Sequence, residues 1–137
     1  MENDIKKYIR QREPIIMVDA VIENDGKVET GLYIDKNNMF LKDGLFRESG
    51  IVEHIAQSVA TIMGLECEEA NKPVPLGFIV SVRDLEIFDL PAAGSTLTTE
   101  ITIVNKVLNV VIVKGYTRIR QTPVARCEMR IFIEETN

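Results

Sequence analysis

The chain of 137 residues contains no tryptophan, one histidine and two cysteines. The single histidine, His54, excludes an HExxH metal motif and limits any Ser-His-Asp set to one imidazole. Cys67 and Cys127 stand far apart without CxxC spacing, so they cannot build a zinc site or a disulfide framework. We therefore expect no metal ion, no cofactor, and a reducing, cytoplasmic location.

Positive charge and long apolar runs are also scarce. The 16 Lys and Arg residues are outnumbered by 21 Asp and Glu residues, giving a formal net charge of −5. This balance disfavours nucleic-acid binding, because phosphate recognition depends on clustered basic side chains. The charged N-terminus has no apolar signal-peptide core, and the longest uncharged central stretch, residues 54–65, is too short to span a bilayer. We expect neither a nucleic-acid partner nor a membrane span.

The residues that are present are typical of a globular protein. Hydrophobic residues make up 45% of the chain and charged residues 27%, which argues against disorder. At this length a single domain, residues 1–137, is expected. Runs rich in β-branched residues and bounded by turn residues predict strands at residues 15–22, 27–34, 76–88, 96–105, 107–118 and 124–134.

One segment, residues 50–63, has helical periodicity, with a wide apolar arc opposite a polar one. Ser49 is placed to cap this helix, and Gly64 to end it. A lone helix with a wide apolar arc needs one large apolar surface to cover it. Strands that follow one another through short turns favour a curved antiparallel sheet of about six strands around the helix, an α+β fold, over a doubly wound one.

The residues that could carry chemistry gather on one edge of this helix. Glu53 and Gln57 are four positions apart, so their side chains lie one above the other, beside the small residues Ala56 and Ala60. This arrangement leaves room for a ligand, although a Glu and a Gln on a polar arc are also typical of a solvated surface. His54 points about 100° away from Glu53, and a lone helical histidine is more often a surface or hydrogen-bonded residue than a catalyst.

Four segments resemble the FabZ-type 3-hydroxyacyl-[acyl carrier protein] dehydratases. Residues 12–19 (REPIIMVD) resemble the family's HRxPFLLVD opening, and residues 50–57 (GIVEHIAQ) its central-helix motif with Glu and Gln. Residues 78–83 (FIVSVR) and 93–95 (AGS) resemble its FLAGID strand and PGD turn. The resemblance implies a hot-dog fold, a long central helix wrapped by an antiparallel sheet. It also implies a homodimer, paired through edge strands, with the active site at the dimer interface.

The resemblance implies that Glu53, supported by Gln57, acts on an acyl thioester carried by an acyl carrier protein or coenzyme A. The reaction would remove water across C2–C3 in fatty-acid or polyene-type biosynthesis. It needs a base for the C2 proton and an acid for the leaving hydroxyl group. Backbone N–H groups near residues 49–52, at the helix N-terminus, are suited to stabilise the charge that develops on the thioester carbonyl.

The sequence departs from this family at one important point. The family's His-Phe-Pro-Gly loop motif is absent, and Leu45 and Phe46 stand where its His and Phe are expected. Leu45 cannot transfer a proton, which leaves three alternatives. The chain dehydrates its substrate through an altered site, with Glu53 acting alone or with help from another polar group such as Asn38 or His54. It hydrolyses thioesters with the helix carboxylate, as hot-dog thioesterases do. Or it is an incomplete subunit that pairs with another hot-dog dehydratase, as a hetero-pair or in a higher oligomer.

Substrate-binding residues are expected around an apolar tunnel for the acyl chain. The candidates are Phe40, Leu45, Phe46, Gly50, Ile79, Val80 and Phe88, which would serve equally as plain core. An acidic carrier protein would need a local basic patch to dock on. Two pairs on strand faces, Arg118 with Arg120 and Arg126 with Arg130, could form one, and a solvated sheet face would look the same.

Overall fold

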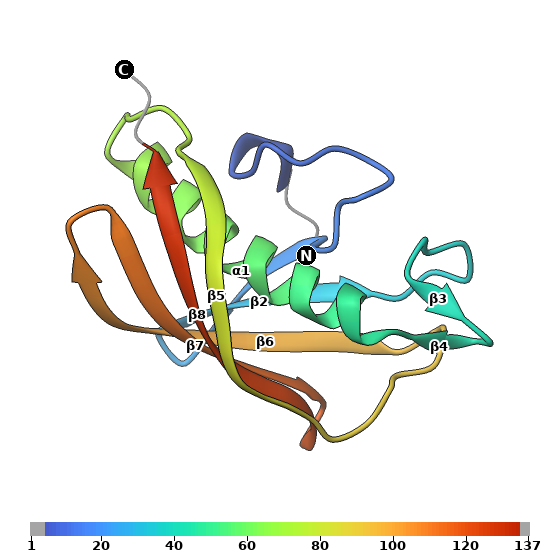
Figure 1. The fold of residues 1–137 in the computed structure, drawn as a ribbon. Helices are drawn as coiled ribbons and strands as arrows, with labels where there is room; N and C mark the ends of the chain where they lie inside the picture. The colour runs from blue at the N-terminus through green and yellow to red at the C-terminus, as the bar shows by residue number, and fades with distance from the viewer. Residues whose placement is uncertain (1–4, 135–137) are drawn as a thin grey trace.

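A computed structural model describes residues 5–134 and has one long helix lying against a curved antiparallel sheet (Figure 1). The helix, α1 (Glu48–Glu69), is preceded by a short 3-10 helix, η1 (Ile5–Lys7). The strands are β1 (Ala20–Asn24), β2 (Lys27–Tyr33), β3 (Leu41–Lys42), β4 (Leu45–Phe46), β5 (Leu76–Ile87), β6 (Thr96–Val107), β7 (Val110–Ile119) and β8 (Thr122–Glu134). Within residues 5–134, no helix combines the length and apolar character needed to cross a bilayer.

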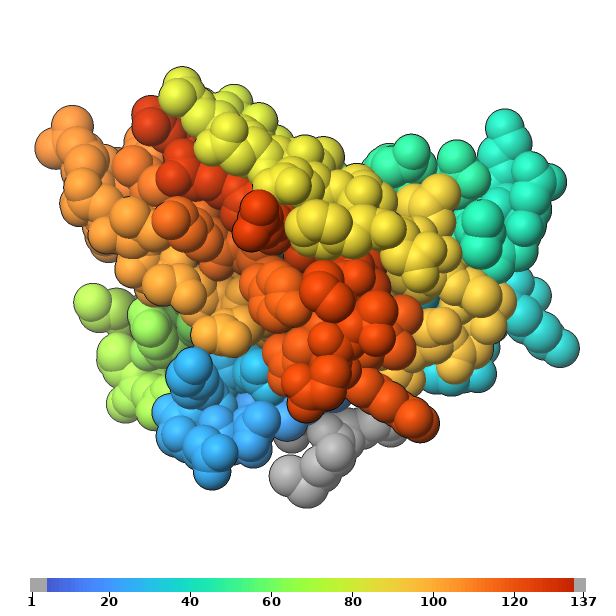
Figure 2. Space-filling view, turned by 90° about the horizontal axis from the view of Figure 1, so that it is seen from below, coloured from blue at the N-terminus to red at the C-terminus, as the bar shows by residue number. Residues whose placement is uncertain are grey.

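The main sheet has six strands in the order β1-β2-β6-β7-β8-β5, and β3 pairs only with β4. All pairings in the main sheet are antiparallel. This confirms the predicted α+β architecture of one helix on a curved sheet of about six strands. The hairpin β1–β2 and the strand β5 lie at opposite margins of the sheet (Figure 2). On edge strand β5, Phe78, Ile79 and Val80 are 49%, 42% and 59% exposed.

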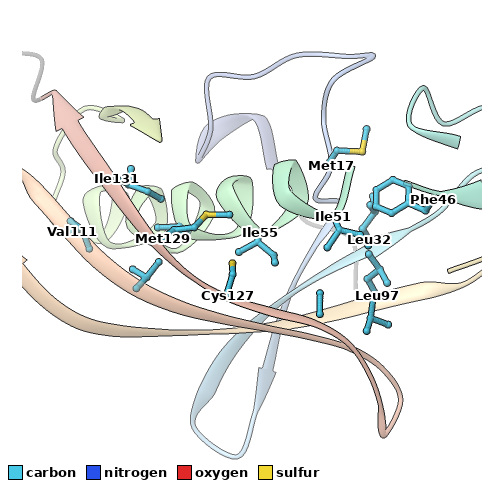
Figure 3. Close-up of a cluster of buried hydrophobic side chains, with 14 of the residues drawn as sticks. Met17, Leu32, Phe46, Ile51, Ile55, Leu97, Val111, Cys127, Met129 and Ile131 are labelled. Carbon is cyan, nitrogen blue, oxygen red and sulfur yellow. The ribbon is translucent and has the colours of Figure 1, made fainter. Parts of the chain in front are cut away.

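The core lies between the helix and the concave face of the sheet (Figure 3). Ile51, Ile55 and Val59 form the buried stripe of α1, as the helical period predicts. Alternate residues of each strand face them, because side chains along a strand point to opposite sides in turn. The buried strand residues include Leu32, Leu97, Val111, Val113, Cys127, Met129 and Ile131.

The first predicted strand is wrong in its position. We expected a strand over residues 15–22, but β1 begins only at Ala20. The reason is that backbone groups of residues 15–17 hydrogen-bond to side chains of α1 instead of to a neighbouring strand. The carbonyl oxygen of Ile15 and the amide of Met17 both bond to Gln57. The segment therefore lies along the helix as an irregular strap.

The helix extends further at both ends than predicted. Ser49 lies inside the first turn, and Arg47 occupies the N-cap position without a side-chain cap. Gly64 lies within α1, so its role is not to end the helix. It is a point of close approach, because a Cβ placed on Gly64 would collide with the backbone carbonyl of Tyr8. A glycine here lets the N-terminal segment pack directly on the helix backbone.

We expect Gly64→Ala to lower the free energy of unfolding by about 1–3 kcal/mol, the usual cost of forcing extra atoms into a packed site. In an open helix the same change would stabilise, because alanine is the better helix former. Urea unfolding checks the prediction. Glu66→Ala, at an exposed position two residues further along α1, should change stability by less than about 0.5 kcal/mol. A Gly64→Ala variant as stable as the parent would contradict this close approach.

Candidate functional site

Glu53 lies beside an elongated cavity of about 300 Å³, here called the α1–β5 cavity. This volume is at the small end of the range for ligand pockets. The helix contributes Glu53, Ala56, Val59, Ala60 and Met63 to its wall. The remaining wall comes from the N-terminal segment, the start of β5 and the end of β8: Ile9, Arg10, Gln11, Pro75, Leu76, Gly77, Phe78, Ile79, Ile131 and Ile133. Glu53 is the one carboxyl group in this described lining.

Gln57 holds the Glu53 carboxyl group in place. Its Nε2 donates to Oε1 of Glu53 at 2.9 Å and to the carbonyl oxygen of Ile15 at 2.7 Å. Its Oε1 accepts from the backbone N–H of Met17 at 2.6 Å. Because Gln57 is fully buried and bonded at both ends of its amide, it cannot rotate without breaking these bonds. Among the described residues, nothing donates a hydrogen bond to Oε2 of Glu53, which leaves that oxygen available to a ligand.

His54 is fully buried and faces the strap and the sheet. The Met17 carbonyl oxygen can only accept, so Nδ1 of His54 carries the proton and donates to it at 2.6 Å. Nε2 therefore accepts from the Thr99 hydroxyl group at 2.7 Å. The Thr99 oxygen in turn accepts from the hydroxyl group of Thr117, also at 2.7 Å. Both ring nitrogens are thus used, and His54 is not part of the cavity lining.

Burial lowers the pKa of His54 to about 4, because a charged imidazolium would lose its hydration there. The bond to Met17 opposes this shift but does not cancel it. His54 is therefore neutral at physiological pH, which agrees with the hydrogen bond it accepts from Thr99.

The other polar candidate, Asn38, stabilises a turn. Its Oδ1 accepts from the backbone N–H of Phe40 at 2.8 Å, and its Nδ2 lies 3.4 Å from the sulfur of Met17. Asn38 is not among the residues that line the α1–β5 cavity. It contacts the strap from the loop between β2 and β3.

The predicted substrate-binding residues separate into two groups. Phe40, Phe46 and Gly50 pack together at the N-terminal end of α1, where a Cβ on Gly50 would lie 2.6–2.8 Å from the two phenylalanines. Leu45, in β4, is half-buried beside them, and none of these residues lines the cavity. Ile79 does line it, whereas Val80 is exposed on the edge strand. Phe88 lies at the opposite end of β5 and stacks on Arg126.

Local sequence patterns do not reveal the part of the cavity wall that comes from distant segments. Ala56 and Ala60 were singled out by their size, but Ile9 and Gln11 carry no local signal. Their position follows from the close approach at Gly64, which brings the N-terminal segment onto the helix. A glycine inside a helical period was the only sequence feature that pointed to this contact.

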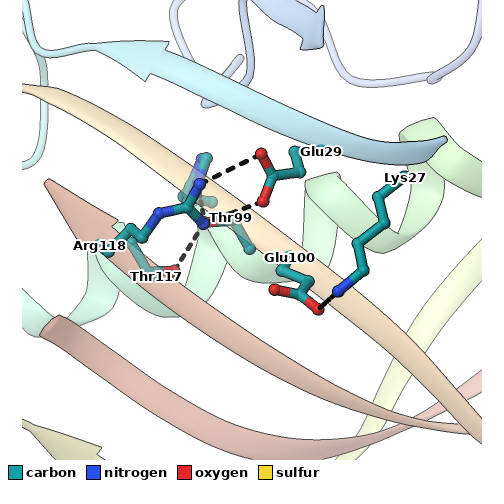
Figure 4. A network of polar contacts seen from close by, with 7 residues as sticks. Lys27, Glu29, Thr99, Glu100, Thr117 and Arg118 are labelled. Carbon is teal, nitrogen blue, oxygen red and sulfur yellow. Dashed lines mark hydrogen bonds and ion pairs between the residues drawn. The ribbon is translucent and has the colours of Figure 1, made fainter. Parts of the chain in front are cut away.

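Two of the four arginines predicted to form a docking patch, Arg118 and Arg126, are engaged within the chain. Arg118 makes two bonds to the buried carboxylate of Glu29, at 2.9 and 3.2 Å (Figure 4). This partner holds the pKa of Glu29 below its ordinary value. Arg126 bonds to Glu86 at 2.7 and 2.8 Å. Neither guanidinium is a free positive charge. No group of His, Cys, Asp and Glu residues suited to a metal ion is found among residues 5–134.

We expect the stability of the protein to fall between about pH 6.5 and pH 4 because of His54. In this range the unfolded imidazole binds a proton that the folded one does not, so the stabilisation is complete above pH 6.5 and is lost as the pH falls. Between pH 7.5 and pH 5 the expected loss is about 2 kcal/mol. Urea unfolding at both values measures it, and His54→Gln should remove most of the difference.

The carboxyl group of Glu29 does not interfere with this measurement, because its pKa is lowered from 4.5 and its effect appears only at lower pH. An equal loss in the parent and in His54→Gln would contradict the buried neutral state of His54.

Comparisons with known proteins agree with the helix-on-sheet geometry. The chain resembles the structure of the dehydratase heterocomplex ApeI:P from Xenorhabdus doucetiae, with a TM-score of 0.86 and 17% identity over 97% of this chain and 91% of that one. It also resembles a hypothetical thioesterase with coenzyme A from Streptococcus pneumoniae TIGR4, with a TM-score of 0.64 and 12% identity over 86% and 87%. The uncharacterized protein PH1136 from Pyrococcus horikoshii matches with a TM-score of 0.67 and 13% identity over 100% and 97%. At these identities the matches show the hot-dog fold alone.

Among curated proteins, none matches the chain. The family model described as ApeP-like, ApeP dehydratase, matches residues 3–136. It confirms the resemblance to dehydratases drawn from the sequence motifs. Since the match spans nearly the whole chain, the protein belongs to the ApeP-like dehydratase family.

Proposed function

We propose that this chain removes water from 3-hydroxyacyl thioesters, with Glu53 as the catalytic carboxyl group. The observation that carries the proposal is the position of Glu53. Its carboxyl group is fixed by Gln57 through one oxygen and borders an otherwise largely apolar cavity. Membership of a dehydratase family supports this reaction type. The substrate is an acyl chain on an acyl carrier protein or coenzyme A, with the chain in the cavity and the thioester at Glu53.

One carboxyl group can perform both proton transfers in turn. The Glu53 carboxylate takes the proton from C2, and the electron pair moves towards the thioester carbonyl. The carboxylic acid so formed then gives this proton to the hydroxyl group on C3, which leaves as water while the C2–C3 double bond forms. Gln57 is a positioning residue, because its bond to Oε1 leaves Oε2 directed to the substrate. His54 and Asn38 act through the strap rather than on the substrate.

One of the N–H groups first expected to stabilise the thioester oxygen is already used inside the helix. The N–H of Ile51 already donates to the carbonyl oxygen of Arg47 at 3.1 Å. We therefore propose that a second subunit completes the site across the β5 edge. Exposed apolar side chains along the edge strand β5 favour such an interface. One structurally similar protein is a dehydratase heterocomplex, which supports a pairing subunit role for this chain as the second candidate function.

Replacing Glu53 tests the proposed chemistry. We expect Glu53→Gln to lower the rate of enoyl-thioester formation at least 100-fold, because the amide cannot accept the C2 proton, a step worth about 10²–10⁴-fold. The assay follows enoyl absorbance and free thiol together on 3-hydroxyacyl-pantetheine substrates. Glu48→Gln, on the first turn of the same helix and exposed, should keep the parent rate.

If the parent protein releases free thiol without enoyl absorbance, the reaction is hydrolysis and the proposed dehydration is wrong. Equal dehydration rates in Glu53→Gln and the parent would remove Glu53 from the mechanism. Enoyl formation that appears only after mixing with a second hot-dog dehydratase subunit would establish the pairing role.

The β5 interface is tested by placing a charge on it. We expect the parent to be a dimer, and Val80→Lys to weaken the dimer at least tenfold, because an unpaired ammonium group is costly to bury at an interface. Light scattering over a range of protein concentrations measures this. The control, Leu108→Lys, changes a side chain that is 89% exposed at the β6–β7 turn and should leave the dimer intact. Dimers of equal strength in both variants would contradict an interface at β5.

A further inference from the structure

We infer that the α1–β5 cavity limits the acyl chain to a medium length of about ten carbons, and that Ala60 and Met63 set this limit. The inference rests on the proposed function, since it takes the reacting end of the substrate to lie at Glu53. The argument comes from the shape of the cavity wall and from the size of the side chains along it.

The helix gives the cavity its length. Glu53 and Met63 both line it and are ten residues apart, which corresponds to about 15 Å along the helix axis. Residues 70–75 connect α1 to β5 directly, so Leu76 lies near the C-terminal part of the helix. Met63 and Leu76 therefore bound the end of the cavity that is remote from Glu53. An extended chain that starts at Glu53 meets these two side chains.

Small residues keep the middle of the cavity open. Ala56 and Ala60 lie between Glu53 and Met63 on the same side of the helix, and Gly77 faces them from β5. A Cβ on Gly77 would lie 3.4 Å from Ile131 and 3.5 Å from Ile133, so any larger side chain there would extend into the cavity. Apart from Arg10 and Gln11 of the N-terminal segment, the walls are otherwise apolar beyond the carboxyl group, with Phe78 the one aromatic residue in the described lining. Apolar walls of this kind fit a hydrocarbon chain.

The cavity volume of about 300 Å³ lies at the small end of the range for ligand pockets, which favours a medium chain over a long one. The length and the volume thus agree on a medium chain. A chain of sixteen carbons would have to leave its end outside the cavity, where it gains no further burial.

Binding of saturated acyl-pantetheine thioesters with four to sixteen carbons, followed by calorimetry, tests this inference. These probes lack the 3-hydroxyl group, so binding is measured without dehydration. Affinity should rise roughly fourfold per added methylene up to about ten carbons, and then stop rising. Ala60→Leu should weaken the ten-carbon ligand at least tenfold while changing the four-carbon ligand less than threefold. Met63→Ala should move the limit to longer chains.

The matched control is Ala70→Leu, which adds the same atoms at an exposed position outside the cavity and should leave the profile unchanged. Met63→Ala removes atoms, so it tests the limit even if Ala60→Leu does not fold. Affinity that rises steadily to sixteen carbons, or profiles equal in Ala60→Leu and Ala70→Leu, would overturn the inference. The expected profile with no dehydration in the parent would leave the inference standing and overturn only the proposed reaction.

Discussion

The whole site depends on three hydrogen bonds between α1 and the strap of residues 15–17. Gln57 bonds to the backbone of Ile15 and Met17, and His54 bonds to the carbonyl oxygen of Met17. Each of these groups is buried or half-buried, so breaking a bond would leave a polar atom without water, at a cost of about 1–3 kcal/mol. The bonds therefore fix the path of the N-terminal segment. That path in turn supplies one wall of the cavity and the direction of the Glu53 side chain.

The helix illustrates how much of such a site can be predicted from a sequence. The helical period correctly separated the apolar stripe of Ile51, Ile55 and Val59, and the four-residue spacing correctly placed Gln57 against Glu53. The polar arc of the helix was expected to be either a solvated surface or a binding site. It instead combines a cavity wall at Glu53 with buried polar residues. Ser58 and His54 are buried against hydroxyl groups of Thr30 and Thr99. The sequence does not reveal which strand residues will hydrogen-bond to which helix residues, because these partners are 28 and 45 positions apart.

The strands also show that structure set by neighbouring residues can be predicted, whereas structure set by distant residues cannot. Turn residues and β-branched runs located β2 and β5 to β8 well, since these signals act over a few neighbouring residues. Residues 15–19 have the same composition but not the same structure, because the amide of Gln57 competes successfully for their backbone groups. The aromatic residues Phe40 and Phe46 were expected near substrate, and they instead close the N-terminal end of α1 around Gly50. Size and hydrophobicity alone do not distinguish a cavity wall from a core.

The neutral state of His54 has a consequence for the chemistry next to it. A cation beside Glu53 would stabilise both its carboxylate and the negative charge that develops on a thioester oxygen. His54 cannot supply this charge above about pH 4, and the arginines at positions 118 and 126 are paired with carboxylates elsewhere. In the described lining of the cavity the cationic side chain is Arg10, whose Nη2 donates to the carbonyl oxygen of Val74 at 3.1 Å. Gln57 fixes the Glu53 carboxyl group through one oxygen, so the proposed second subunit at the β5 edge would bear on activity as well as on assembly.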